Sequence, residues 1–182
     1  MSYPGYGFFW GLPFLFNRGP NVRLYVQENS YIINQDTVNY DVEPSTQMRL
    51  NMREVQRLND ELREELNKNR VNKRRAIELY SEIREISQEI ADESFYDYLD
   101  IVDTLPINES YYDDIFETPD DLSPQMRLKA LEVQRVTNML QNELQRRPVD
   151  KVKALDLYFY IRTTAQEIAD ERFFDYLDSI ID

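Results

Sequence analysis

Apolar residues recur at helical spacing along most of this chain. From Ser45 onward they are three, four or five positions apart with charged residues between them, as Leu50, Val55, Leu58, Leu62 and Leu66. After residue 72 a second run follows, with Ala76, Leu79, Tyr80, Ile83 and Ile90. Two amphipathic helices joined by a turn of about five residues pack as an antiparallel hairpin. The pattern therefore predicts a helical hairpin over residues 45–103.

The same pattern returns 78 residues later (125 minus 47). Residues 47–100 align without a gap with residues 125–178, and about half of the positions are identical. A period this long indicates a duplicated supersecondary unit, because common solenoid repeats are roughly 20–50 residues long. We expect an equivalent hairpin over residues 124–182, with Leu128, Val133, Val136, Leu140 and Leu144 on its first helix.

Cap residues mark where these helices begin. Ser123 followed by Pro124 is a strong helix start, and Asn72 and Asp150 are equivalent candidates for the N-cap of each second helix. The predicted fold class is mainly α, with two tandem duplicated antiparallel hairpins, four long helices in all. The hairpins most simply pair by pseudo-two-fold symmetry; alternatively, each docks separately on a partner.

Residues 1–44 differ in composition from the rest. All four glycines lie within the first nineteen residues, and residues 22–41 favour a short β-hairpin or an extended arm. The aromatic run near the start would form an exposed patch that soluble monomers avoid. We expect it to anchor the chain in an interface or assembly, with the partner-binding residues Phe9, Trp10, Phe14 and Phe16. One alternative is folding back over the helices. The other is shallow membrane insertion, which the lack of basic residues within the aromatic run disfavours.

Residues 104–123 form an acidic, aromatic linker without a basic residue. We expect a recognition segment in it, made of Tyr111, Tyr112, Asp113, Asp114, Ile115 and Phe116. The whole chain carries a formal charge of −13, so direct nucleic-acid binding is disfavoured. The expected partner is a protein with a basic or apolar-grooved surface, and a homo-oligomer of this chain is a further possibility.

The chain has no Cys and no His. Disulfides, thiol nucleophiles, the commonest metal ligand and the commonest general base are therefore excluded. We expect no enzyme activity, no cofactor and no metal. The start has no basic signal region and the apolar run is too short to span a bilayer, which predicts a soluble cytoplasmic protein, free or in a larger particle.

Carboxylates follow one stripe of each predicted second helix. This acidic face comprises Glu89, Asp92, Glu93, Asp97 and Asp100, and in the second copy Glu167, Asp170, Glu171, Asp175 and Asp178. Di-metal bundles also use inward carboxylates, but they require His, so a solvated or partner-facing surface is the better interpretation. The neighbouring aromatics Phe95 and Phe173 are expected to pack in the cores.

The sequence thus favours a non-catalytic protein–protein interaction or assembly protein that uses two equivalent helical faces and an aromatic anchor. The alternative is an acidic nucleic-acid mimic that inhibits a DNA- or RNA-binding enzyme, such as a phage-encoded nuclease or CRISPR blocker. In that case the acidic face would replace phosphates.

Overall fold

A computed structural model of the chain describes residues 45–104 and 123–181. These residues form α3 (Thr46–Leu66), α4 (Lys73–Ile101), the short 3-10 helix η1 (Val102–Thr104), α5 (Pro124–Leu144) and α6 (Lys151–Ile181). Within these two ranges there is no strand, which confirms the mainly helical fold there. The predicted hairpin in residues 22–41, the rest of the N-terminal arm and most of the linker lie outside the described residues.

The predicted caps are present. The hydroxyl of Ser123 accepts a hydrogen bond from the backbone N–H of Met126 at 3.2 Å, and Ser45 makes the equivalent bond at the start of α3. Asn72 and Asp150 accept through their side chains from residues three positions later, at 3.2 and 3.1 Å. These bonds satisfy N–H groups that have no partner within the first helical turn.

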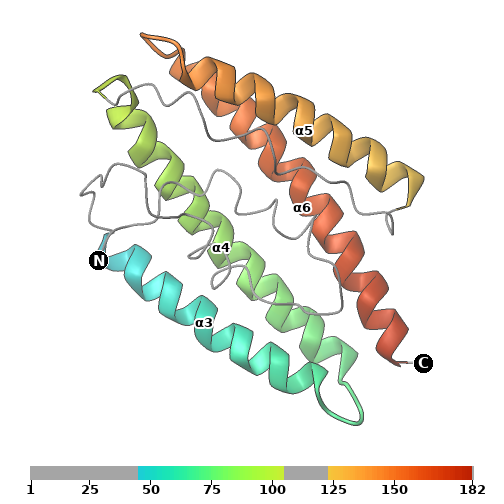
Figure 1. Cartoon of the computed structure of the whole chain (residues 1–182). Helices are drawn as coiled ribbons and strands as arrows, with labels where there is room; N and C mark the ends of the chain where they lie inside the picture. Colours follow the sequence, from blue (N-terminus) through green and yellow to red (C-terminus); the bar gives the residue numbers. More distant parts are fainter. Residues whose placement is uncertain (1–44, 105–122, 182) are drawn as a thin grey trace, which may run out of the picture. The chain divides into compact units, whose positions relative to one another are not determined.

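Cross-helix contacts show that α3 and α4 are antiparallel (Figure 1). Asn51, early in α3, donates to Glu89 in the middle of α4 at 3.3 Å. Arg75, at the start of α4, donates to Glu61 near the end of α3 at 2.9 Å. The pairing thus runs in opposite directions along the two helices, as a hairpin with a short turn requires.

The helices α5 and α6 pair in the same way. Lys129 donates to Glu167 at 2.9 Å, and these residues occupy the positions equivalent to Asn51 and Glu89. At the turn, Lys153 lies 2.8 Å from Glu143. The second hairpin is therefore also antiparallel.

The buried apolar positions largely follow the predicted stripes. They include Val55, Leu58, Leu62, Tyr80, Ile83, Ile90 and Phe95 in the first hairpin, and Val133, Val136, Leu140, Tyr158, Ile161, Ile168 and Phe173 in the second. The expectation that Leu50 and Leu128 belong to these stripes is wrong, since they are 51% and 69% exposed. Five positions separate them from the buried Val55 and Val133, which rotates them off the stripe, and Met48 and Met126 are buried instead.

The described residues fall into two compact units, and each unit takes segments from both hairpins. One contains residues 45–97 and 174–181; the other contains 98–104 and 123–173. Within the first unit, Lys73 forms an ion pair with Asp178, and the Tyr80 and Phe174 rings meet edge to face at 6.5 Å. Within the second, the Asp103 carboxylate accepts from the backbone N–H of Val149 at 2.8 Å. The end of each long second helix is thus part of the unit built mainly from the other hairpin.

Candidate interaction surface

The ten residues predicted to bind a partner all lie outside the described part of the chain. They are Phe9, Trp10, Phe14 and Phe16 in the arm and Tyr111, Tyr112, Asp113, Asp114, Ile115 and Phe116 in the linker. Their proposed role stays a prediction from the sequence.

The acidic face lies at the surface of α4 and α6. Five of its carboxylates are exposed and five are partly exposed, so none of the ten is buried. Several are bonded to neighbouring helices: Glu89 accepts from Asn51, Glu167 from Lys129, and Asp178 from Lys73. The Lys129 ammonium is held by the Glu167 carboxylate, and this bond raises the pKa of Lys129. These carboxylates therefore link helices as well as face solvent.

In residues 45–104 and 123–181, no three carboxylates lie close enough together to hold a metal ion. The acidic face is consequently a row of separate charges along each helix in the described structure.

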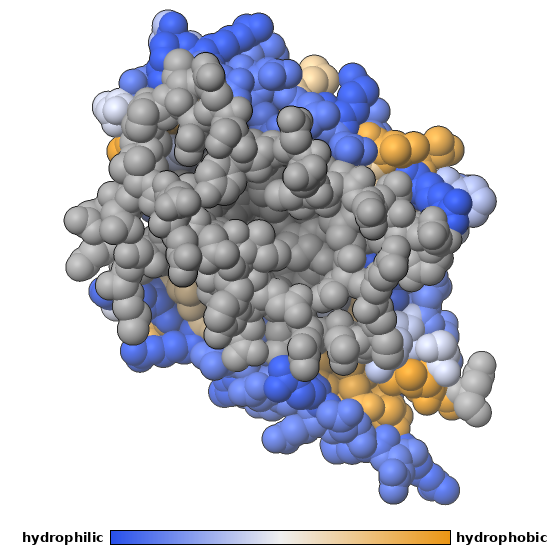
Figure 2. Space-filling model, viewed as in Figure 1, coloured by the Kyte–Doolittle hydropathy of each residue, from blue (hydrophilic) through white to orange (hydrophobic). Residues whose placement is uncertain are grey.

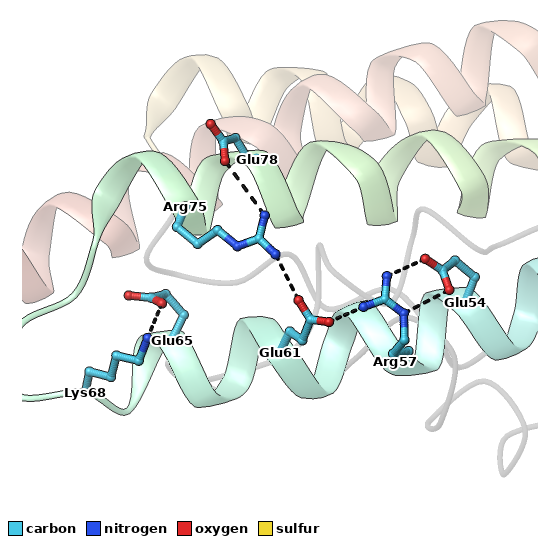
Figure 3. Close-up of polar contacts among 7 residues, drawn as sticks. All are labelled: Glu54, Arg57, Glu61, Glu65, Lys68, Arg75 and Glu78. Carbon is cyan, nitrogen blue, oxygen red and sulfur yellow. Dashed lines mark hydrogen bonds and ion pairs between the residues drawn. The ribbon is translucent and has the colours of Figure 1, made fainter.

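An ion-pair network at the surface of the first hairpin joins α3 to α4 (Figure 3). Arg57 donates to Glu54 at 3.0 Å and also pairs with Glu61. Glu61 in turn accepts from Arg75 of α4 at 2.9 Å, and Arg75 lies 3.8 Å from Glu78. The Arg57 hydrogen bond lowers the pKa of Glu54, and the same bond raises that of Arg57. Charged groups thus satisfy one another along this side of the first hairpin.

The exposed side of α5 differs because it carries three large apolar residues among its polar ones. Figure 2 shows hydrophobic patches interrupting a mostly hydrophilic surface on the described helices. Leu128, Leu131 and Met139 are 69%, 51% and 39% exposed. Between them, Arg135 donates to Glu132 at 2.8 Å. We call these residues the α5 outer face: Leu128, Leu131, Glu132, Arg135 and Met139.

Helical spacing explains why these residues share one side. Leu128, Leu131, Arg135 and Met139 are three or four positions apart, so their side chains follow one stripe of α5. The buried residues of the helix lie on other stripes; they include Met126, Ala130, Val133, Val136 and Leu140. The α5 outer face therefore contributes little to the core of its hairpin.

The gapless alignment of residues 47–100 with residues 125–178 already contains this difference. Leu131 occupies the position of Arg53, and Met139 the position of Glu61. A comparison of outward positions between the copies would have found the surface from the sequence. Apolar periodicity alone does not reveal it, because apolar residues at helical spacing are interpreted as core positions.

A second feature that the sequence pattern does not predict is a buried carboxylate at each helical turn. Glu65 and Glu143 are only 5% and 2% exposed. Each accepts a backbone N–H from seven residues later, Glu65 from Asn72 at 2.8 Å and Glu143 from Asp150 at 3.4 Å. The sequence does contain a signal for this role. Glu65 and Glu143 occupy equivalent positions in the last turns of α3 and α5, where a negative charge is unfavourable to the helix dipole.

Hydrogen bonds to these carboxylates lower their pKa values. For Glu65 the main cause is the bond from Lys68 at 2.6 Å, followed by the Asn72 N–H. For Glu143 the main cause is Lys153, and burial opposes part of this effect. Both groups therefore stay ionised to a lower pH than an ordinary glutamate.

The chain matches no family model, no curated protein and no solved structure. Among the helices of the described ranges, none combines the length and the apolar character that crossing a bilayer requires. The surfaces described above are therefore the basis for proposing a function.

Proposed function

We propose that this protein is a non-catalytic protein–protein interaction or assembly protein of the cytoplasm, built from two duplicated hairpins. The observation that carries the proposal is the α5 outer face, where Leu128, Leu131 and Met139 are exposed at outward positions. Apolar side chains on the solvent side of a helix do not stabilise its own core, whereas they do provide area that a partner can bury.

The first hairpin provides an internal comparison. Arg53 and Glu61 stand at the positions of Leu131 and Met139, and Glu61 forms ion pairs with Arg57 and Arg75. A purely solvated surface would need no apolar residues at these positions in one copy alone. The contrast supports a specific role for α5, and the aromatic arm would supply further anchors.

The alternative of a nucleic-acid mimic draws less support from the described residues. A mimic needs carboxylates that are available to a basic groove, but Glu167 and Asp178 are engaged by lysines of this chain. Breaking such pairs would oppose binding to a basic partner. The mimic hypothesis nevertheless makes a distinct prediction, because its complex would dissociate in high salt.

Affinity capture from the source lysate tests the proposal. Full-length protein is compared with the double variant Leu128→Glu/Leu131→Glu, with the arm variant Trp10→Ala/Phe14→Ala, and with Leu50→Glu as the matched control on α3. We expect a partner that resists high-salt washing, is retained by Leu50→Glu, and is lost or depleted with Leu128→Glu/Leu131→Glu.

Two results would contradict the proposal. One is a partner set that all three variants retain unchanged. The other is a nucleic-acid enzyme that salt or added DNA releases and that Glu93→Arg/Glu171→Arg no longer binds, which would establish the mimic.

A further inference from the structure

We infer that the α5 outer face binds the same face of a second copy of this chain, as an antiparallel helix pair. This inference rests on the proposed interaction function and names the partner. The three exposed apolar residues Leu128, Leu131 and Met139 span about 16 Å of α5, at about 1.5 Å of rise per residue. They therefore form a stripe long enough for helix-to-helix packing.

The order of residues along α5 is self-complementary. Consider a two-fold axis that passes midway between residues 133 and 134 of both copies. It places each residue of one α5 opposite the residue of the other α5 that lies equally far beyond this midpoint. Leu128 lies as far before this midpoint as Met139 lies after it, and Glu132 lies as far before it as Arg135 lies after it. One axis therefore places Leu128 of each copy opposite Met139 of the other, and Glu132 opposite Arg135.

Both kinds of contact are chemically favourable across that axis. Packing Leu128 of one copy against Met139 of the other removes both side chains from water at each end of the stripe. Arg135 already donates to both carboxylate oxygens of Glu132 on its own helix, through Nε and Nη2, and through Nη1 to the sulfur of Met139. Two of its five N–H groups make none of these bonds and can donate to Glu132 of the second copy. Its aliphatic stem can lie against Leu131 of that copy, which extends the apolar contact through the centre.

The equivalent surface of α3 has the charge pair but only one of the three apolar residues, Leu50. Glu54 and Arg57 occupy the positions of Glu132 and Arg135. The same axis would, however, place Leu50 opposite Glu61, which is bonded to Arg57 and Arg75. A dimer through α3 would bury the charges of this network without new partners, which costs free energy. The second hairpin, and not the first, is therefore the self-association surface.

Sedimentation velocity on the full-length chain tests the inference. A single helix pair is a small interface, so we expect reversible dimers with a dissociation constant on the order of 10 µM. Samples from about 1 to 500 µM would show a shift from monomer to dimer. Leu128→Glu/Leu131→Glu should weaken dimerisation by about tenfold or more, and Leu50→Glu should leave it unchanged.

Charge reversal tests the register. Glu132→Arg alone and Arg135→Glu alone each place like charges across the axis and should weaken the dimer. The double variant Glu132→Arg/Arg135→Glu restores opposite charges at both symmetric contacts and should recover dimerisation. The double exchange also restores the ion pair within each helix. Circular dichroism and thermal unfolding of each variant therefore separate a loss of folding from a loss of dimerisation.

Three results would overturn the inference. The first is a monomer throughout the concentration range. The second is a dimer that Leu128→Glu/Leu131→Glu does not weaken. The third is a dimer that depends on Trp10 and Phe14 instead of α5. If the chain stays monomeric while capture of a different protein still needs Leu128 and Leu131, the proposed function stands and only the self-association fails.

Discussion

The carboxylate of Glu65, in the last turn of α3, accepts a hydrogen bond of 2.8 Å from the backbone N–H of Asn72, whose own side chain caps α4. The end of one helix is thereby joined to the start of the next. Glu143 and Asp150 repeat this relationship in the second hairpin at 3.4 Å. The buried carboxylate fixes how the chain turns, because it supplies the acceptor that the turning backbone would otherwise lack.

Replacing this carboxylate should destabilise the fold. Glu65→Ala removes the acceptor of the Asn72 N–H and the partner of Lys68, so we expect the thermal midpoint to fall by several degrees. Thermal unfolding followed by circular dichroism measures this. Glu64→Ala is the matched control because Glu64 is the exposed neighbour on the same helix, and it should shift the midpoint by about 1 °C or less. Equal effects of the two changes would refute a structural role for Glu65.

The same groups predict a pH dependence of stability. The pKa values of Glu65 and Glu143 are lowered in the folded chain, so the unfolded chain binds protons at a higher pH than the folded one. Their contribution is therefore complete above the ordinary glutamate value of 4.5 and is lost as the pH falls through the lowered pKa values.

Urea unfolding at a series of pH values measures this dependence. The midpoint should be steady near neutral pH and should drop below about pH 4.5. The variant Glu65→Gln/Glu143→Gln should lose less stability on acidification, although some loss remains because Glu54 and Glu132 also have lowered pKa values. If the urea midpoints of the variant and the wild type fell in parallel with pH, Glu65 and Glu143 would not be the source of the acid sensitivity.

The cap of α5 should contribute measurably to stability. Ser123→Ala removes the hydroxyl that accepts from Met126, which should lower the free energy of unfolding by about 1 kcal/mol. Ser123→Asp keeps a capping acceptor and should preserve stability. Chemical denaturation of both variants provides the comparison, and a loss of similar size in both would show that capping is not the cause.

The core of the second hairpin should be sensitive to truncation at Ile168. Its side chain is fully buried, so Ile168→Ala should reduce the free energy of unfolding by about 2–5 kcal/mol. Val152 is 71% exposed on the same helix, and Val152→Ala should change the free energy of unfolding by less than about 0.5 kcal/mol. Urea titrations of the two variants measure this contrast, and a small loss at Ile168 would indicate that the site can collapse around the deletion.

The helices and their caps could be predicted because their determinants are local. The spacing of Val55, Leu58 and Leu62 reflects the helical repeat, and Ser123 acts on a residue three positions away. The positions of α3 and α5 therefore follow closely from the sequence pattern. Leu50 and Leu128 were misassigned because apolar character alone does not distinguish a core position from an outward one.

The candidate surface was harder to predict because it depends on burial. An acidic residue such as Glu143 is normally exposed, and only the fold places it where a backbone N–H and Lys153 compensate its burial. Likewise, apolar spacing alone does not show that Leu131 and Met139 are exposed, although their alignment with Arg53 and Glu61 indicates outward positions. The predicted arm and linker anchors remain predictions from the sequence.

The composition of the compact units implies that the two halves of this chain depend on each other to fold. Leu177 is fully buried in the unit that contains most of the first hairpin, and Val102 is fully buried in the other. A gene divided within residues 105–122 would separate Lys73 from Asp178 and Asp103 from Val149. Each fragment alone would expose apolar surface. Co-expressed fragments would supply residues 98–104 and 174–181 to one another's units and restore the fold.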